Sequence, residues 1–271
     1  MIVDEAFKTR CTELAAALAS TYSKGSPPFD LRCLQERYNV GEVRERLLDR
    51  DAQLLAVDGA FTIEINSAVS AARRRMSLAH EFGHLIVNEV AGGNSFASHS
   101  NPEIERLCNT IAGELICPKA AIVAHFSKQQ DLDTWSEPIR CQTVIDAALT
   151  FGVSVDLMAR RVFVDLRMAR SSVALVWRFG DNTKTGTPGA ALRVASAWHD
   201  LGRKTFVPLN KTVPAGSVIA KAFERNGSFR GMEDFALGSM KGTFEVEASG
   251  FMSFPLRSMS PPVRAVLSVL R

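Results

Sequence analysis

The segment RMSLAHEFGH at residues 75–84 contains an HExxH spacing within a stretch, 72–90, whose pattern predicts one long helix. On a helix, His80 and His84 lie one turn apart on one face, so both imidazoles can reach a single metal ion. Glu81 then lies beside the ion rather than on it. A glutamate in that place can take a proton from the water that attacks a carbonyl and pass it to the leaving amine. The segment therefore predicts a zinc centre that hydrolyses an amide bond.

The third zinc ligand must come from another segment, because a catalytic zinc ion has three protein ligands and one open position. The extended motif HExxHxxGxxH is absent, since Val87 and Val90 occupy its glycine and histidine positions. The alternative is a carboxylate on the next predicted helix, 101–117, which begins at the cap residue Asn101 and is stopped by Pro118. Its candidate ligands are Glu103, Glu105 and Glu114.

The helical face of each glutamate separates these candidates. Glu105 shares one face with Asn109, four residues later, whereas Glu103 and Glu114 lie about 200° and about 180° away from it around the axis. If one of the three faces the metal with a polar companion, it is therefore Glu105, and Glu114 is interpreted as a surface carboxylate. Asn109 is then placed to hydrogen-bond the second ring nitrogen of a ligand histidine.

Two segments, RMSLAHEFGH at 75–84 and ERLCNTIAGELICP at 105–118, resemble the ImmA/IrrE family of metallopeptidases. The family pattern is R-F-T-x-A-H-E-x-G-H followed by E-x-x-A-N-x-F-A-A-E-L-L-M-P. The departures keep an apolar or small residue, and they are Met76, Cys108, Ile111 and Cys117. The resemblance covers residues 40–167 and is only loose over 171–271. It implies a site-specific endopeptidase that cleaves a helix-turn-helix transcriptional repressor and so relieves repression. The cofactor is expected to be one Zn2+, with Mn2+ as a substitute.

The expected fold class is α+β, in three parts. Residues 1–127 are predicted to form a zincin-like metallopeptidase domain with a small sheet and the active-site helices. Its strand 61–66 forms a hairpin with 53–57, and its exposed edge is expected to receive an extended substrate. Residues 128–170 are predicted as a helix-turn-helix-like segment, and residues 171–271 as an α+β domain where some relatives carry a GAF-like sensor. The C-terminal pattern favours strands at 173–177, 192–198, 205–209, 243–246 and 266–270 and a helix at 217–225.

Two further roles stay open. Arginines within residues 143–178, in a C-terminal half with 17 Lys and Arg against 9 Asp and Glu, allow DNA contact. The alternative is that these helices pack on the catalytic domain or hold the substrate. The oxyanion stabiliser is also open: His99 and His125 are candidates only as the nearest spare imidazoles, and an ordinary surface or packed histidine is the alternative. Residues 73–75, three arginines, are interpreted as structural or solvated rather than as a docking patch.

Composition narrows the class of protein. The chain of 271 residues has 46% hydrophobic and 23% charged residues, which is typical of a globular protein. No stretch approaches the roughly 18 apolar residues of a membrane span, and the N-terminus lacks a signal peptide, so we expect a cytoplasmic protein without a membrane partner. Five scattered cysteines predict reduced thiols. The alternative function is a non-enzymatic, metal-stabilised regulator that binds DNA or a repressor through its C-terminal half.

Overall fold

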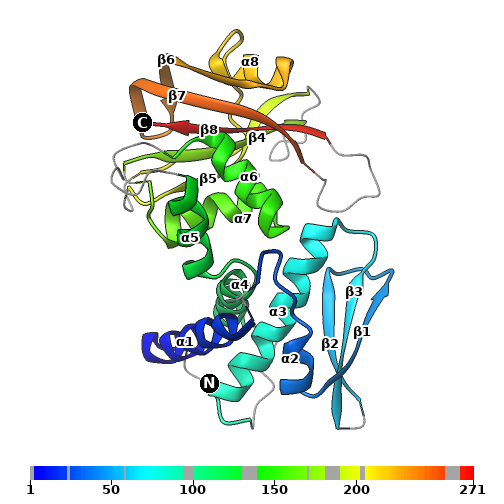
Figure 1. Ribbon diagram of the computed structural model, residues 1–271. Coiled ribbons are helices and arrows are strands. Elements are labelled where there is room, and N and C mark those ends of the chain that lie inside the picture. The colour runs from blue at the N-terminus through cyan, green and yellow to red at the C-terminus, as the bar shows by residue number, and fades with distance from the viewer. Residues whose placement is uncertain are drawn as a thin grey trace. The chain divides into compact units, whose positions relative to one another are not determined.

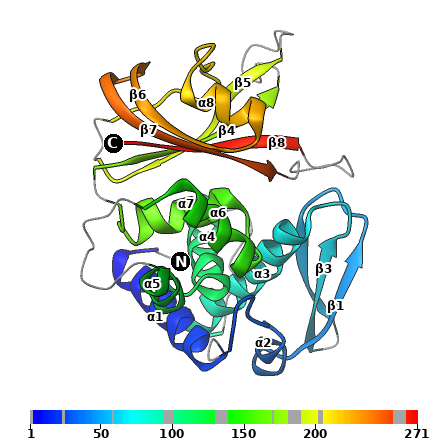
Figure 2. The same cartoon turned by 45° about the horizontal axis from the view of Figure 1, so that its top comes forward.

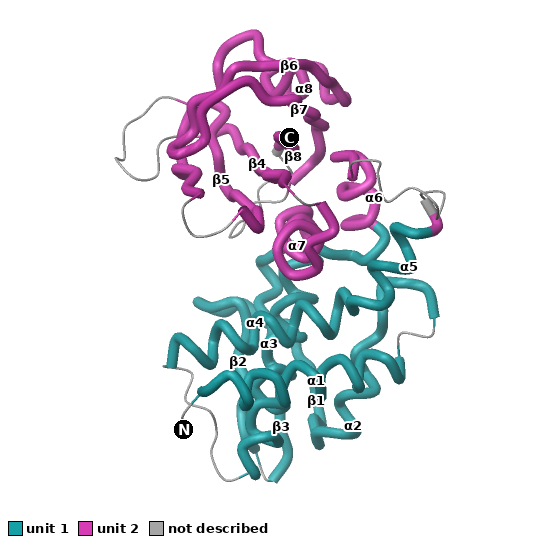
Figure 3. Tube along the Cα trace, turned by 90° about the vertical axis from the view of Figure 1, so that its left-hand side faces the viewer, with its two compact units in different colours: residues 1–127, 150–153, 256–259 teal, residues 128–149, 154–255, 260–271 magenta. Residues whose placement is uncertain are grey.

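The chain has a mixed α+β fold with two sheets (Figure 1). The computed structural model describes residues 3–22, 25–57, 59–93, 101–129, 139–169, 171–180, 190–201, 205–253 and 263–271. It divides into two compact units (Figure 3), of which unit 1 comprises 1–127, 150–153 and 256–259 and unit 2 comprises 128–149, 154–255 and 260–271. The sequence interpretation treated 128–170 as a part of its own, whereas this division groups most of it with the C-terminal sheet.

Unit 1 combines a three-stranded sheet with the helices that carry the HExxH segment. Its elements are α1 (Glu5–Tyr22), α2 (Cys33–Arg37), β1 (Val40–Arg46), β2 (Ala52–Val57), β3 (Ala60–Asn66), α3 (Ala71–Val90), α4 (Pro102–Ile116) and most of α5 (Lys119–Gln129). The strand order is β1-β3-β2, with β3 parallel to β1 and antiparallel to β2. The predicted hairpin of β2 and β3 is confirmed. The predicted exposed edge at 61–66 is wrong, because β3 is the central strand and β2 is an edge strand in the described sheet.

Helix α3 lies between the sheet and α4 (Figures 1 and 2). It begins at the cap Ser70, whose hydroxyl accepts a hydrogen bond from the Arg73 amide. Helix α4 begins as predicted, with the Asn101 side chain accepting from the Glu103 amide and proline at the first position. The apolar faces of both helices are buried, with Phe82 of α3 fully inaccessible to solvent. Packing of these faces fixes the two segments that carry the candidate ligands.

Three successive arginines attach the start of α3 to its surroundings. Arg73 donates from Nε to Asp51 at 2.9 Å, Arg74 donates to backbone oxygens just before the helix, and Arg75 donates to the Phe29 carbonyl at 2.5 Å. The structural interpretation of residues 73–75 is thereby supported over a docking patch.

Unit 2 is a five-stranded antiparallel sheet with helices on both faces (Figure 2). Its elements are α6 (Cys141–Phe151, whose last two residues are assigned to unit 1), α7 (Val155–Arg160), a π-helical turn η1 (Arg161–Asp165), β4 (Val173–Gly180), β5 (Ala191–His199), α8 (Val218–Arg225), β6 (Ser228–Leu237), β7 (Met240–Ser253) and β8 (Val263–Leu270). The strand order is β5-β4-β8-β7-β6. The strand expected at 205–209 is absent, since these residues form a loop and turn, and β6 was not predicted.

Helix α7, the second helix of the predicted helix-turn-helix, is held to this sheet by polar contacts. Asp156 accepts hydrogen bonds from Arg178 of β4 and Ser196 of β5, each at 2.5 Å. On α6, the buried Glu247 carboxylate of β7 accepts the Cys141 amide at 2.7 Å. The Asp156 side chain and the first amide of α6 are therefore engaged with the sheet of unit 2.

None of the single helices in the described ranges is long and apolar enough to cross a membrane. Helices α4 and α5 together meet the length and composition of a span, across a bend of 46°. The apolar face of α4 is buried within unit 1, where Ile104, Ile111 and Leu115 are at most 2% exposed.

Candidate metal centre

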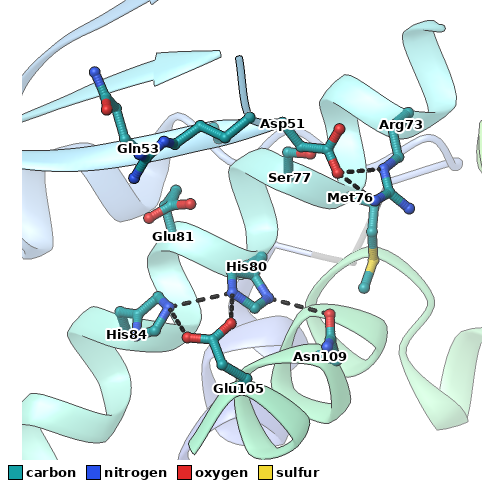
Figure 4. A pocket seen from close by; sticks show the side chains of 12 residues that line it. Asp51, Gln53, Arg73, Met76, Ser77, His80, Glu81, His84, Glu105 and Asn109 are labelled. Carbon is teal, nitrogen blue, oxygen red and sulfur yellow. Dashed lines mark hydrogen bonds and ion pairs between the residues drawn. The ribbon is translucent and has the colours of Figure 1, made fainter. Parts of the chain in front are cut away.

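Three predicted ligand side chains converge between α3 and α4 (Figure 4). The His80 and His84 Nε2 atoms are 3.2 Å apart. One Glu105 oxygen lies 3.1 Å from His80 Nε2, and the other lies 3.4 Å from His84 Nε2. The structure therefore brings together the two histidines of one helix and the carboxylate of the next.

The spacing of these atoms fits a tetrahedral zinc ion. With Zn–N and Zn–O bonds of about 2.0–2.1 Å, tetrahedral ligand atoms lie about 3.3 Å from one another. The His80 and His84 Nε2 atoms, 3.2 Å apart, agree with that value, and each of them lies within 3.4 Å of one of the two Glu105 oxygens. A carboxylate and two imidazoles are also a donor set that zinc accepts. The residues present thus fit the implied ion.

Asn109 orients the first histidine. Its Oδ1 lies 3.1 Å from His80 Nδ1. An amide oxygen can only accept, so Nδ1 carries the hydrogen and Nε2 keeps its lone pair toward the other ligands. This is the arrangement expected for Asn109 from its position four residues after Glu105.

Glu81 lies beside the centre rather than in it, between His80 and the strand that carries Gln53 (Figure 4). Its side chain is 5% exposed, and its Oε2 meets no hydrogen-bond donor among the residues that the structure describes. Burial raises the pKa of Glu81 to about 7, the Glu105 carboxylate raises it as well, and the charge of Arg50 opposes both. A buried carboxyl with that pKa can both accept and return a proton near neutral pH.

A glycine sets the distance between the two ligand-bearing helices. A Cβ at Gly83 would lie 3.1 Å from both the Cα and the carbonyl oxygen of Cys108. Both contacts are with backbone atoms, so no side-chain movement could relieve them. Gly83 therefore allows α3 and α4 to approach closely enough for Glu105 to meet the histidines.

The three ligands open into a cleft of about 380 Å³. Its lining residues are Arg50, Asp51, Ala52, Gln53, Arg73, Met76, Ser77, His80, Glu81, His84, Glu105 and Asn109. The segment 50–53, at the start of the edge strand β2, was not predicted as part of the site. It carries no motif, and only the hairpin that follows it could have suggested its position.

The two histidines proposed as oxyanion stabilisers gain no support from the structure. His125 on α5 packs its ring against Phe126 and Phe151, and it is not among the residues that line the cleft. His99 lies outside the described residues. Among the residues that the structure describes, those that line the cleft are therefore the better candidates for the oxyanion stabiliser.

The fold and the converging side chains define a metallopeptidase-type centre, with two histidines of an HExxH helix and one carboxylate. The model of the peptidase M78 family, described as an IrrE N-terminal-like domain, matches residues 29–163. The chain therefore carries a domain of this family, which confirms the resemblance to the ImmA/IrrE family.

Similarity to solved structures extends over a larger part of the chain. A structure titled "Mycobacterium tuberculosis transcriptional regulator" matches with a TM-score of 0.54 and 12% sequence identity, over 96% of this chain and 74% of that chain. At that identity the match shows a similar fold. A comparison with curated proteins finds no match.

Proposed function

We propose that this chain is a zinc-dependent endopeptidase. The observation that carries this proposal is the convergence of His80, His84 and Glu105, whose ligand atoms lie within 4.8 Å of one another, beside a buried glutamate with a raised pKa. A purely structural zinc site closes all four positions with protein ligands and needs no base. Here the structure offers three ligands and a base in an open cleft.

When bound, the metal ion would polarise the substrate carbonyl and acidify a water molecule. Glu81 then carries the proton in both steps of the reaction. Glu81 accepts one proton as the water oxygen bonds to the carbonyl carbon and the C=O electron pair moves onto oxygen. When the C–N bond breaks, Glu81 returns that proton to the amine nitrogen. One water is consumed, and a carboxyl and an amine are released.

The free edge of strand β2 in the described sheet favours a substrate that binds as an extended protein segment. Ala52 and Gln53 line the cleft, and Leu55 and Val57 further along the strand are 36% and 49% exposed. Since β2 pairs with β3 on one side, a substrate segment can add to its other side by main-chain hydrogen bonds. We therefore propose β2, rather than β3, as the strand whose edge receives the substrate.

We infer from the resemblance that the substrate is a regulatory protein, a helix-turn-helix repressor whose cleavage relieves repression. The C-terminal unit would then hold the substrate or sense a signal as a GAF-like domain. Direct DNA contact through 143–178 is a weaker proposal, because Arg161 and Arg178 pair with Asp165 and Asp156 within unit 2.

The decisive experiment uses Glu81→Gln in the full chain. The variant should bind one zinc, because Gln keeps the shape and leaves the three ligands in place, yet fail to cleave a helix-turn-helix repressor encoded next to the gene. Glu103→Gln, an exposed carboxylate on α4, is the matched control and should cleave normally. Cleavage by Glu81→Gln at the wild-type rate would refute the general-base role. Zinc binding with no cleavage by wild type would favour the non-enzymatic regulator.

A further inference from the structure

Most polar donors of the cleft are already engaged. Arg73 donates to Asp51, which ties the start of α3 to the segment before β2. Gln53 donates from Nε2 to the buried Glu64 carboxylate at 2.8 Å. Asn109 faces His80. None of these groups can turn to a substrate without breaking a contact that orders the site.

Arg50 differs from these residues. It lines the cleft with the three ligands and Glu81, and its Nε lies 3.4 Å from Asp49. That pair is exposed, with side chains 62% and 87% accessible, and an exposed ion pair contributes little stability. No other hydrogen bond or ion pair restrains the guanidinium within the described part of the chain.

We infer that Arg50 is the catalytic residue that stabilises the oxyanion during amide hydrolysis. This inference rests on the proposed function. As water adds to the carbonyl carbon, the carbonyl oxygen becomes negative, and N–H groups of the guanidinium can donate charge-assisted hydrogen bonds to it. Arginine suits this task because it stays charged at every relevant pH and its fork of donors is rigid. Substrate on the β2 edge would cover Arg50 and exclude water, which strengthens the interaction.

The test measures binding of an oxyanion mimic to the zinc-loaded full chain. The probe is N-phosphoryl-leucyl-tryptophan, whose tetrahedral phosphoryl group imitates the adduct of water and an amide. Removal of one oxyanion donor typically lowers the catalytic rate about 100-fold or more, so Arg50→Gln should raise the dissociation constant of the probe by about 100-fold. Arg50→Lys keeps the charge but loses the forked donors of the guanidinium, and its affinity for the probe should lie between those of wild type and Arg50→Gln.

Two controls separate this role from general effects. Arg44→Gln removes the same charge from β1, where Arg44 pairs with Glu42 and does not line the cleft, and it should bind the probe like wild type. Imidazole, a neutral zinc ligand, should bind all variants equally. Probe binding by Arg50→Gln within about threefold of wild type would overturn the inference while leaving the peptidase intact. An equal loss for imidazole would overturn it too, because Arg50 would then act through the metal site. A zinc-loaded wild type that does not bind the probe would overturn the proposed function together with this inference.

Discussion

Glu81 should destabilise the metal-free protein above neutral pH, and its replacement should show by how much. An increase of its pKa from 4.5 to about 7 corresponds to about 3 kcal/mol of unfavourable free energy for the ionised form. The folded state has the higher pKa, so it binds more protons than the unfolded chain between these values. Stability from this group is therefore complete below pH 4.5 and is lost as the pH rises through 7. Glutamine cannot ionise, so Glu81→Gln should escape the loss.

Urea unfolding with a chelator, followed by circular dichroism, measures this effect. The stability of Glu81→Gln relative to wild type should increase by about 2 to 3 kcal/mol between about pH 5 and about pH 8. Glu13→Gln removes an exposed carboxylate from α1 of the same unit and should show no comparable change. Parallel pH curves for Glu81→Gln and wild type would refute the claim that burial and Glu105 hold the carboxyl in its neutral form. A gain in stability would indicate that Glu81 is retained for chemistry rather than for the fold.

Three further predictions concern the support of the site. Asn109→Ala should weaken zinc binding by about 10- to 100-fold in a chelator competition, because His80 loses the partner that fixes its ring; unchanged affinity would contradict that role. Gly83→Ala should destabilise the protein by about 1 to 3 kcal/mol in thermal unfolding, despite its better helix propensity, because its Cβ meets the backbone of α4. Arg75→Ala should cost about 2 to 4 kcal/mol in urea unfolding, because the buried Phe29 carbonyl loses its donor, and zinc content should stay at one ion per chain.

The helices of the site could be predicted because their signals are local. The cap Asn101, the following proline and the HExxH spacing place α3 and α4 to within a residue or two of their observed bounds. The helical face of Glu105 then identifies the third side chain of the cluster. No such local signal exists for Arg50, which reaches the cleft only because the hairpin folds back over α3.

The main error of the sequence interpretation concerned the pairing of strands that are distant in the sequence. A turn in the sequence signals the hairpin of β2 and β3, but no local signal indicates that β1 pairs in parallel with β3. The sequence pattern therefore placed β3 at an edge of the sheet. Strand β6 was missed because Gly231 and Glu233 interrupt its apolar alternation. The structure explains both residues by α8: a Cβ at Gly231 would lie 3.1 Å from Val218, and Glu233 accepts the Val218 amide at the start of that helix. Both residue types are disfavoured in strands, but their contacts with α8 outweigh that low strand propensity.

The close approach of α3 and α4 at Gly83 also bears on how the centre acquires its ion. Because backbone packing at Gly83 brings together the two helices that carry the donors, loading should require little rearrangement and unloading should leave the helices in place. In zinc fingers, by contrast, the folded state depends on the ion. We therefore expect this chain to remain folded when it loses its ion, so that metal supply could switch its chemistry on and off without consuming the protein.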